Sequence, residues 1–317
     1  STKDTIMEAV EKLNYHPNQV AVGLLKKRTQ TIGLIISDVS NVFFATLAKG
    51  VEDACRRQGW NLILCNTNDK HERDLACIQV LADKGVDGIV FCMARDSDRE
   101  KVQESMDLMD KLKMPFVMVD RYLEGADCSS VIVNHIQGGY AATKHLLERG
   151  HRKIGCVTGP SKLEDSQRRL AGYQKALMEY RIPYREELVY EGNYDRESGA
   201  RAAAYFLNDC SEVSAIFAFN DMSAYGVYAR LKKEGYRVPK DISLLGYDDI
   251  FFSEILDVPL TTVKQPVYDM GVEGVRLLLE EIESEKRSKK CVTFQPELIV
   301  RESVREWKDN SEKEFVV

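Results

Sequence analysis

Short apolar runs alternate with longer amphipathic segments along most of the 317-residue chain. The apolar runs are bounded by turn residues, as is typical of strands buried in parallel sheets. They predict nine strands, at residues 31–37, 61–67, 87–92, 115–120, 129–134, 153–159, 187–193, 214–220 and 242–249. Between them, apolar side chains recur with the period of a helix. These segments predict eight helices, at residues 43–58, 72–84, 98–112, 137–149, 164–180, 197–208, 222–234 and 267–285.

The strand and helix predictions together indicate an α/β protein. Repeated strand–helix–strand units form parallel sheets with helices on both faces. Nine strands are too many for one compact sheet, and a divide near residue 134 separates them into two sets. We therefore predict two doubly wound, parallel-sheet lobes.

The first 29 residues follow a different pattern. Ile6, Val10 and Leu13 would share one face of a helix that ends before Pro17. The segment after Pro17 has the pattern of a second, very short helix. A helix this short is marginal on its own, so it would need a partner or a bound surface to become ordered. A disordered linker is the alternative.

Composition indicates an ordinary globular protein, with 44% hydrophobic and 30% charged residues. No apolar run approaches the roughly 18 residues that read as a membrane span, and the N-terminus lacks the apolar core of a signal peptide. We therefore expect a cytoplasmic protein without a membrane partner. The eight cysteines form no C-x-x-C motif, which favours reduced thiols over disulfides or a metal site.

Charge is unevenly distributed along the chain. The net charge of −6 is unlike the basic surface of a typical nucleic-acid binder. Residues 1–29, however, contain five basic and three acidic residues, so a small basic leader precedes an acidic body. The sequence contains no dinucleotide fingerprint, P-loop, H-E-x-x-H or G-x-S-x-G motif, and its histidines lack metal spacing. We therefore predict no enzyme activity, no cofactor and no metal.

Polar residues gather at the ends of the predicted strands. Ligands of doubly wound sheets bind at the carboxyl ends of the strands. Here those ends carry Ser37-Asp38, Asn66, Asp120-Arg121, Asn134, Asn220-Asp221 and Asp248-Asp249. Each pair alone has a simpler explanation as a helix cap or turn. As a set they predict a cleft between the lobes that binds a small polar molecule.

Several segments resemble, in order, the lactose-repressor/galactose-repressor (LacI/GalR) family of transcription factors. They are EAVEKLNYHPNQVAVGLLKKRTQTIGLIISDVSNVFF, DGIVF, KHLLERGHRKIGCVTGP, RRLAGYQKAL, IFAFNDMSAYGVY, VPKDISLLGYDD and PLTTVKQP. The resemblance covers nearly the whole chain. It implies a core like the type I periplasmic sugar-binding proteins, with the chain returning to the first lobe after Gln265. The implied division is 1–29 for a remnant of a DNA-binding domain and hinge, 30–134 plus 266–292 for the first lobe, and 135–265 plus 293–317 for the second.

The resemblance also implies a role for the leader. Family members begin with a three-helix domain whose helix-turn-helix reads the major groove. This sequence starts just before the third helix, so we expect the recognition helix to be missing from it. The remaining hinge segment would fold as a helix in the minor groove of operator DNA, with Leu24 as the wedge that kinks the duplex. The implied DNA-contacting residues are Asn18, Val22, Leu24, Lys26, Lys27 and Arg28.

For the cleft, the resemblance to ribose-binding members of the fold is position by position. Sugar hydroxyls pair with planar polar side chains, and the C–H faces of the ring stack on aromatic side chains. The implied polar shell is Asn41, Asp120, Arg121, Arg169, Asn220, Asp248 and Gln265, and the implied aromatic sandwich is Phe43, Phe44, Tyr194 and Tyr247. Two arginines beside two carboxylates suit a neutral sugar, whereas a purine or a phosphosugar would want a different balance. Pairing of Arg169 with Asp248, and Phe44 as part of the core, are the structural alternatives.

The resemblance therefore implies a repressor that binds a palindromic operator as a homodimer. A monosaccharide, ribose or a similar sugar, would close the lobes and weaken operator binding. Dimer contacts would come from residues 45–58, 72–84, 222–234 and 250–256. A solute-binding protein of a sugar transport system is the main alternative, although it would normally be exported and would have no hinge segment.

Overall fold

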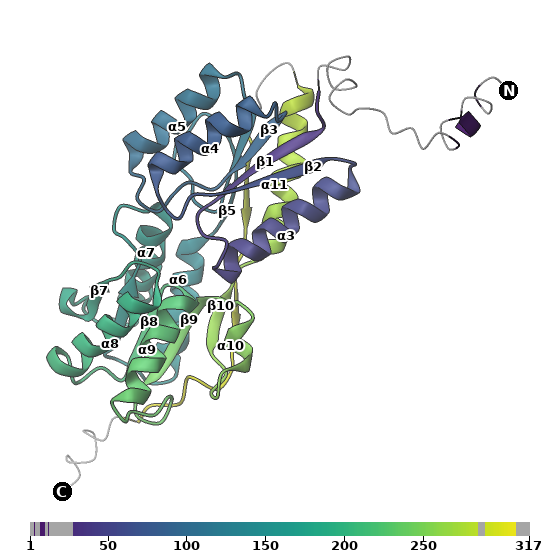
Figure 1. The fold of residues 1–317 in the computed structure, drawn as a ribbon. Helices are drawn as coiled ribbons and strands as arrows, with labels where there is room; N and C mark the ends of the chain where they lie inside the picture. Colours follow the sequence, from purple (N-terminus) through teal and green to yellow (C-terminus); the bar gives the residue numbers. More distant parts are fainter. Residues whose placement is uncertain (1–2, 4–6, 10–11, 13–27, 285–288, 309–317) are drawn as a thin grey trace, which may run out of the picture.

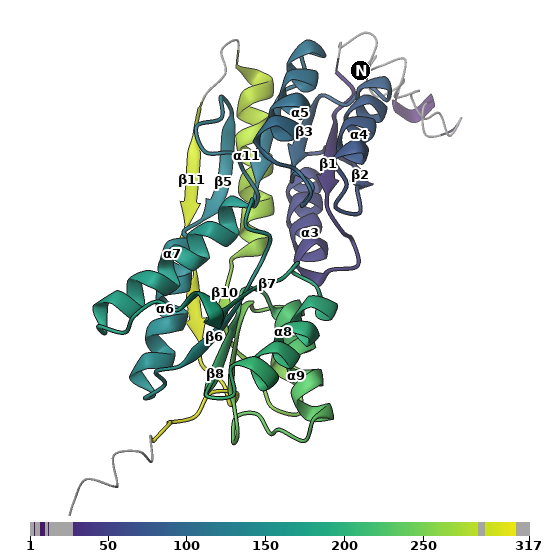
Figure 2. The ribbon, with the colours of Figure 1, turned by 90° about the vertical axis from the view of Figure 1, so that its left-hand side faces the viewer.

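The computed structural model describes residues 3, 7–9, 12, 28–284 and 289–308. These residues form two lobes, each built on a six-stranded sheet with helices on both faces (Figures 1 and 2). All nine predicted strands and all eight predicted helices are present, with ends shifted by a few residues. The predicted fold class, two doubly wound α/β lobes, is confirmed.

The first sheet has the strand order β11–β5–β4–β3–β1–β2, and all of its neighbouring strands are parallel. Its strands are β1 (Thr31–Ile36), β2 (Asn61–Asn66), β3 (Gly88–Phe91), β4 (Phe116–Val119), β5 (Ser129–Val133) and β11 (Cys291–Phe294). Two helices pack together on one face and two cover the other (Figure 1). The first pair is α3 (Val42–Arg57) with α11 (Val267–Glu283), and the second is α4 (His71–Asp83) with α5 (Arg99–Lys111).

The second sheet has the order β12–β10–β9–β8–β6–β7 and is parallel except for its edge strand β12, which runs antiparallel to β10. Its strands are β6 (Ile154–Thr158), β7 (Val189–Glu191), β8 (Ala215–Ala218), β9 (Ser243–Asp248), β10 (Thr261–Lys264) and β12 (Glu297–Ile299). The helices are α6 (His135–Glu148), α7 (Glu164–Glu179), α8 (Arg196–Asp209), α9 (Asp221–Lys233) and the short α10 (Phe252–Ile255). The pair α6–α7 covers one face and the pair α8–α9 the other.

The chain crosses between the lobes three times. The first two crossings follow β5 and β10, near residues 134 and 265. The third was predicted after residue 292, and this boundary is too early. Cys291–Phe294 pairs in register with Ser130–Val133 as one strand of the first sheet, so the crossing follows Phe294.

Close helix contacts fix the part of the second lobe that faces the first. Gly139 of α6 lies against the backbone carbonyl of Arg169 on α7, and Gly172 of α7 lies against the carbonyl of Ile136. A Cβ at either glycine would overlap a backbone atom that cannot move independently, so alanine would force the two helices apart. Arg169 lies on α7 at one of these contacts, so the close packing of α6 and α7 positions its backbone.

The predicted hinge residues Asn18, Val22, Leu24, Lys26 and Lys27 lie outside the described residues. Arg28 is described, and its Nη2 donates a hydrogen bond of 2.9 Å to the carbonyl of Ile282 near the C-terminus of α11. This contact places the start of the core beside the end of α11, at the far end of the first lobe from the second lobe (Figure 1).

Candidate functional site

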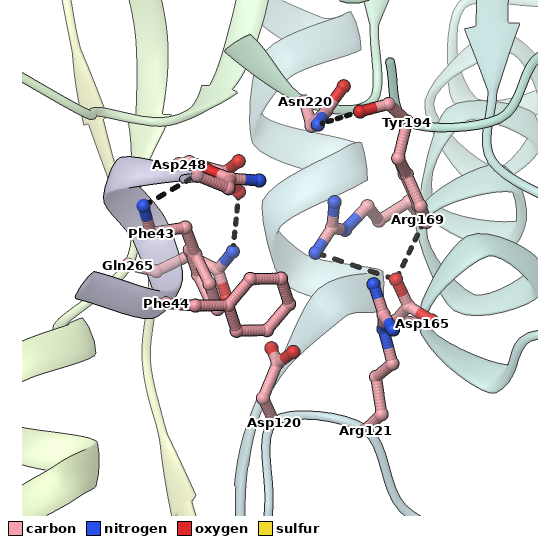
Figure 3. A pocket seen from close by; sticks show the side chains of 11 residues that line it. Phe43, Phe44, Asp120, Arg121, Asp165, Arg169, Tyr194, Asn220, Asp248 and Gln265 are labelled. Atoms are coloured by element: carbon pink, nitrogen blue, oxygen red, sulfur yellow. Dashed lines mark hydrogen bonds and ion pairs between the residues drawn. The ribbon is translucent and has the colours of Figure 1, made fainter. Parts of the chain in front are cut away.

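A small cavity lies between the two lobes, at the carboxyl ends of strands from both sheets. Its lining combines carboxylates, amides, guanidinium groups and aromatic rings (Figure 3). The lining residues are Asn41, Phe43, Phe44, Asp120, Arg121, Asp165, Arg169, Tyr194, Asn220, Asp248 and Gln265. The structure thus brings together ten of the eleven residues predicted for effector binding, places Tyr247 outside the lining, and adds Asp165.

Most lining residues lie at the end of a strand or near the start of a helix. From the first lobe, Asn41, Phe43 and Phe44 begin α3, and Asp120 and Arg121 follow β4. From the second lobe, Asp165 and Arg169 lie on α7, Tyr194 precedes α8, Asn220 precedes α9, Asp248 ends β9 and Gln265 follows β10. A ligand in the cavity would therefore touch both lobes.

Three of these residues have a left-handed backbone conformation, which is uncommon outside glycine. The φ angles are 69° at Asp120, 58° at Tyr194 and 119° at Asp248. Such conformations cost of order 1–3 kcal/mol each and persist where the surrounding structure enforces them, often at functional sites. Here they turn the side chains at the strand ends into the cavity.

Arg169 is the most extensively held cation of the site and is only 3% exposed. Its Nη1 donates to the carbonyl of Phe219, its Nε lies 3.3 Å from Nδ1 of His135, and its Nη2 lies 3.8 Å from Oδ2 of Asp165. The ion pair is thus with a carboxylate of its own helix rather than with Asp248, the partner considered from the sequence.

Tyr247 supports Arg169 from behind instead of lining the cavity. The Tyr247 ring centroid lies 4.0 Å from Cζ of Arg169, a cation–π geometry. Its hydroxyl lies 3.2 Å from Nδ1 of His135. Burial lowers the pKa of His135 to about 3, so its imidazole is neutral and accepts the hydrogen bond from Arg169. Tyr247 and His135 therefore orient the guanidinium without reaching the cavity.

Asp165 was missed in the sequence because an acidic residue in the first turn of a helix is ordinary. Its Oδ2 accepts a 2.7 Å hydrogen bond from the Tyr194 hydroxyl, and the Arg169 guanidinium lies over the Tyr194 ring. Burial would raise the pKa of Asp165, but the charges of Arg169 and Arg121 together with the hydrogen bond from Tyr194 outweigh it, and the pKa is lowered. The i, i+4 spacing of Asp165 and Arg169 on one helix was the available signal.

Arg121 is the corresponding cation of the first lobe. Its Nη1 donates to Ser37 Oγ at 2.8 Å, to Asp69 Oδ1 at 2.7 Å and to the carbonyl of Met93 at 3.2 Å. Its Cζ lies 5.3 Å from the centroid of the Phe44 ring. Phe44 is 4% exposed and packs in the apolar core of the first lobe, so it serves both as a core residue and as a cavity wall.

The two asparagines of the site are also helix caps. Oδ1 of Asn41 accepts from the backbone N–H of Phe43 at the start of α3, and Oδ1 of Asn220 accepts from Ser223 at the start of α9. Nδ2 of Asn220 donates to the carbonyl of Tyr194. Helix capping was the simpler interpretation for these positions. The two asparagines cap helices and also line the cavity.

Gln265 presents an unused acceptor. Its Nε2 donates a 2.7 Å hydrogen bond to Oδ1 of Asp248, while its buried Oε1 has no hydrogen-bond partner among the described residues. Leaving a buried polar atom unpaired costs about 1–3 kcal/mol. A ligand hydroxyl that donates to this oxygen would remove that cost.

The electrostatic balance of the cavity favours a neutral ligand. Burial raises the pKa of Asp120 to about 6 and raises that of Asp248 well above its ordinary value, although Arg169 opposes the second shift. With Asp165, the lining holds three carboxyl groups and two guanidinium groups. Both guanidinium groups already have carboxylate partners, Asp69 and Asp165. Neither cation is therefore free to balance the charge of a phosphate.

Within 28–284 and 289–308 and the few described residues before them, no group of three or more His, Cys, Asp or Glu side chains is placed to hold a metal ion. Across the same part of the chain, no helix is both long enough and apolar enough to cross a membrane.

Comparisons with known proteins agree with this architecture. Residues 29–301 match the family model described as periplasmic binding proteins and the sugar-binding domain of the LacI family. The chain is 38% identical over 305 residues to the HTH-type transcriptional repressor PurR of Vibrio campbellii, covering 96% of this chain and 90% of that protein.

Two solved structures show the same fold with a sugar bound. A LacI family transcriptional regulator from Enterococcus faecium with bound ribose superposes with a TM-score of 0.77 at 30% identity, covering 88% of this chain and 100% of that one. The transcriptional regulator CelR in complex with cellobiose superposes with a TM-score of 0.79, also at 30% identity, covering 95% of this chain and 90% of that one.

Proposed function

Because the chain belongs to the LacI family of transcriptional repressors, we propose that its interlobe cavity binds ribose, or a closely similar monosaccharide, as the effector. The observation that carries this proposal is the composition of the cavity wall. Planar groups able to form paired hydrogen bonds (Asp, Asn, Arg and Gln) surround a space that also has the aromatic rings of Phe43, Phe44 and Tyr194 on its wall. That combination matches a ring with hydroxyls at its edge and C–H groups on its faces.

The charge of the lining supports a neutral sugar over an anionic ligand. An anionic phosphosugar would meet three carboxyl groups and find both guanidinium groups already paired.

The first prediction is direct binding. We expect ribose to bind one site per protomer with a Kd in the micromolar range, about −8 kcal/mol, measured by isothermal titration calorimetry. At a hundredfold excess over Kd, ribose would stabilise the folded protein by about 2.7 kcal/mol, which a thermal-shift assay detects. Ribose 5-phosphate, a hexose and a purine base are the comparison ligands. Binding of the phosphosugar or the purine, with none of ribose, would contradict the proposed effector.

The second prediction concerns DNA. An effector that contacts both lobes binds more tightly when the lobes are closed than when they are open. It stabilises the closed form by the difference between these two binding free energies. Closure would turn the first lobes of a dimer relative to each other and change the spacing of the DNA-contacting segments. In a protein carrying the complete DNA-binding domain, we expect saturating ribose to weaken operator binding by about 5- to 150-fold, measured by fluorescence anisotropy. Tighter operator binding with ribose would make the sugar a co-repressor.

The dimer itself is proposed to use the surface of the second lobe at α9 and α10. The neighbouring side chains Phe251, Phe252 and Ile255 are 64%, 47% and 58% exposed, which is unusual for large apolar residues that lie together. They fall in the segment 250–256 that the family resemblance implies for dimer contacts.

For the DNA contacts we propose Asn18, Val22, Leu24, Lys26, Lys27 and Arg28, and for the location of the protein the cytoplasm.

A further inference from the structure

The rim of the cavity carries a contact between the lobes that the effector would not touch. Arg95, in the segment after β3 of the first lobe, extends to the second lobe, where its Nη1 donates to the backbone carbonyl of Asn193. The same nitrogen lies 4.0 Å from Oδ2 of Asp195. The Arg95 side chain is 22% exposed, so this contact is partly shielded from water.

Asp69 orients Arg95 for its contact with the second lobe. The backbone N–H of Arg95 donates to Oδ1 of Asp69 at 3.0 Å, and Nη2 of Arg95 lies 3.4 Å from Oδ2. Asp69 has a left-handed φ of 59°, which turns its carboxylate inward from the β2–α4 connection. Burial would raise the pKa of Asp69, but the charges of Arg121 and Arg95 outweigh it and the pKa is lowered. Asp69 is therefore ionised at neutral pH.

The same carboxylate contacts the effector site. Oδ1 of Asp69 also accepts the 2.7 Å bond from Nη1 of Arg121, which lines the cavity. Asp69 thus joins a cavity residue to a rim residue within the first lobe.

On the other side of the contact, Asn193 directly precedes Tyr194, which lines the cavity from the second lobe. The segment is fixed by three short contacts. Asn193 N–H donates to Ser198 Oγ at 2.9 Å, Asn193 Nδ2 donates to Asp195 Oδ2 at 3.0 Å, and Asp195 Oδ1 caps α8 by accepting from Ser198 N–H at 2.8 Å. A hydrogen bond to the Asn193 carbonyl therefore also restrains the backbone of Tyr194.

A second contact between the lobes lies one residue further along. Nζ of Lys162, in the β6–α7 connection, donates to the carbonyl of Asp96 at 2.7 Å. It spans the same rim, so Arg95 and Lys162 together fasten the two lobes beside the cavity mouth.

We propose that Arg95 is a positioning residue that sets effector residence time: it fastens the Asn193–Asp195 segment of the second lobe to Asp69, which also orients the effector-site residue Arg121. The inference rests on the proposed effector function. It assigns to Arg95 no contact with the sugar. Removing it would leave the cavity wall intact but make the closed arrangement open more often.

Arg95→Met tests this, because methionine keeps much of the side-chain stem and removes the guanidinium. In the full chain, we expect ribose to dissociate about tenfold faster, in line with loss of a charged hydrogen bond at a partly shielded site, with the association rate within about twofold of the wild type. Stopped-flow measurement of the two rates separates them. Arg276→Met, which removes ion pairs confined to α11, is the matched control and should leave both rates unchanged.

Arg95→Lys distinguishes positioning from simple packing. A lysine can donate to the Asn193 carbonyl but cannot bridge it to Asp69 with a planar fork. We expect partial recovery of the slow dissociation in this variant. Unchanged dissociation in Arg95→Met, or a loss of affinity that arises from slower association alone, would overturn the proposal.

A readout without sugar keeps this test separate from the effector assignment. Small-angle scattering of the effector-free proteins should give a larger radius of gyration for Arg95→Met than for the wild type and for Arg276→Met. If the wild type bound no sugar, the effector proposal would fail, and this comparison alone would test the contact that Arg95 makes between the lobes. Equal radii in all three proteins would then overturn it.

Discussion

Ribose affinity should fall by at least about 100-fold in the Arg169→Met variant, to a Kd of about 100 μM or weaker if the wild-type site is micromolar. Arg169 is buried and faces the cavity with its guanidinium held by Phe219, His135 and Tyr247. A cation that is already oriented loses little entropy when it donates to sugar hydroxyls. Methionine has a similar length but offers no donor, so the ligand would lose its paired hydrogen bonds to the guanidinium.

The same variant should lose about 3 kcal/mol of stability at neutral pH, because removing one partner of a buried ion pair leaves the other charge uncompensated. The uncompensated charge is Asp165, whose pKa is held below its ordinary value in the folded protein. A carboxylate with a depressed folded pKa contributes stability above its unfolded pKa and loses it as the pH falls. The difference between variant and wild type should therefore shrink below about pH 4.

Chemical denaturation at pH 7 and at acid pH, with calorimetry of ribose binding, measures both effects. Arg185→Met is the control, since Arg185 pairs with Glu187 and Glu212 on the surface of the second lobe, away from the cavity. It should bind ribose as the wild type does. Retention of affinity within about threefold in Arg169→Met would remove this residue from the effector site.

The sequence predicted the central strands well because they are buried on both faces and therefore read as continuous apolar runs. It failed for β10, β11 and β12. The last two are short strands at sheet edges with partly exposed patterns, and β10 is only four residues long. What makes Cys291–Phe294 a strand is its pairing with β5, some 160 residues earlier in the chain. A local pattern does not encode such a partner.

The site shows the same division between local and tertiary information. Asp120, Asn220 and Asp248 were predictable because polar residues at strand ends converge in a doubly wound lobe. Asp165 was not, because its role depends on Tyr194, a residue that meets it only after folding. Tyr247 was assigned to the aromatic sandwich from family resemblance, yet it lies behind Arg169, where strand alternation turns its ring away from the cavity.

Asp120→Asn should make the effector-free protein more stable while weakening ribose binding. Asp120 is 6% exposed, and burial raises its pKa to about 6 in the folded protein, from an ordinary value of 3.8. A carboxyl with a raised folded pKa favours folding at low pH, and this advantage is lost as the pH rises through the folded value. At one pKa unit per roughly 1.4 kcal/mol, ionising Asp120 destabilises the protein by up to about 3 kcal/mol above pH 6.

Asparagine removes the charge and keeps a hydrogen-bonding side chain of the same shape. It also tolerates the left-handed backbone of this position, where φ is 69°. We therefore expect Asp120→Asn to gain about 1–3 kcal/mol over the wild type at pH 8 and to lose that gain below about pH 4. Ribose affinity should fall about 10- to 100-fold, since a charged acceptor is replaced by a neutral one.

Opposite changes in stability and binding would identify Asp120 as a residue retained for its ligand rather than for the fold. Denaturation across pH 4–8 and calorimetry of ribose binding test both halves. Asp257→Asn, which removes an exposed carboxylate paired with Lys232, should change neither. A variant that is less stable than the wild type at pH 8 but binds ribose normally would reverse the conclusion. The Asp120 carboxylate would then stabilise the fold through its interaction with Arg121 and would not bind a sugar hydroxyl.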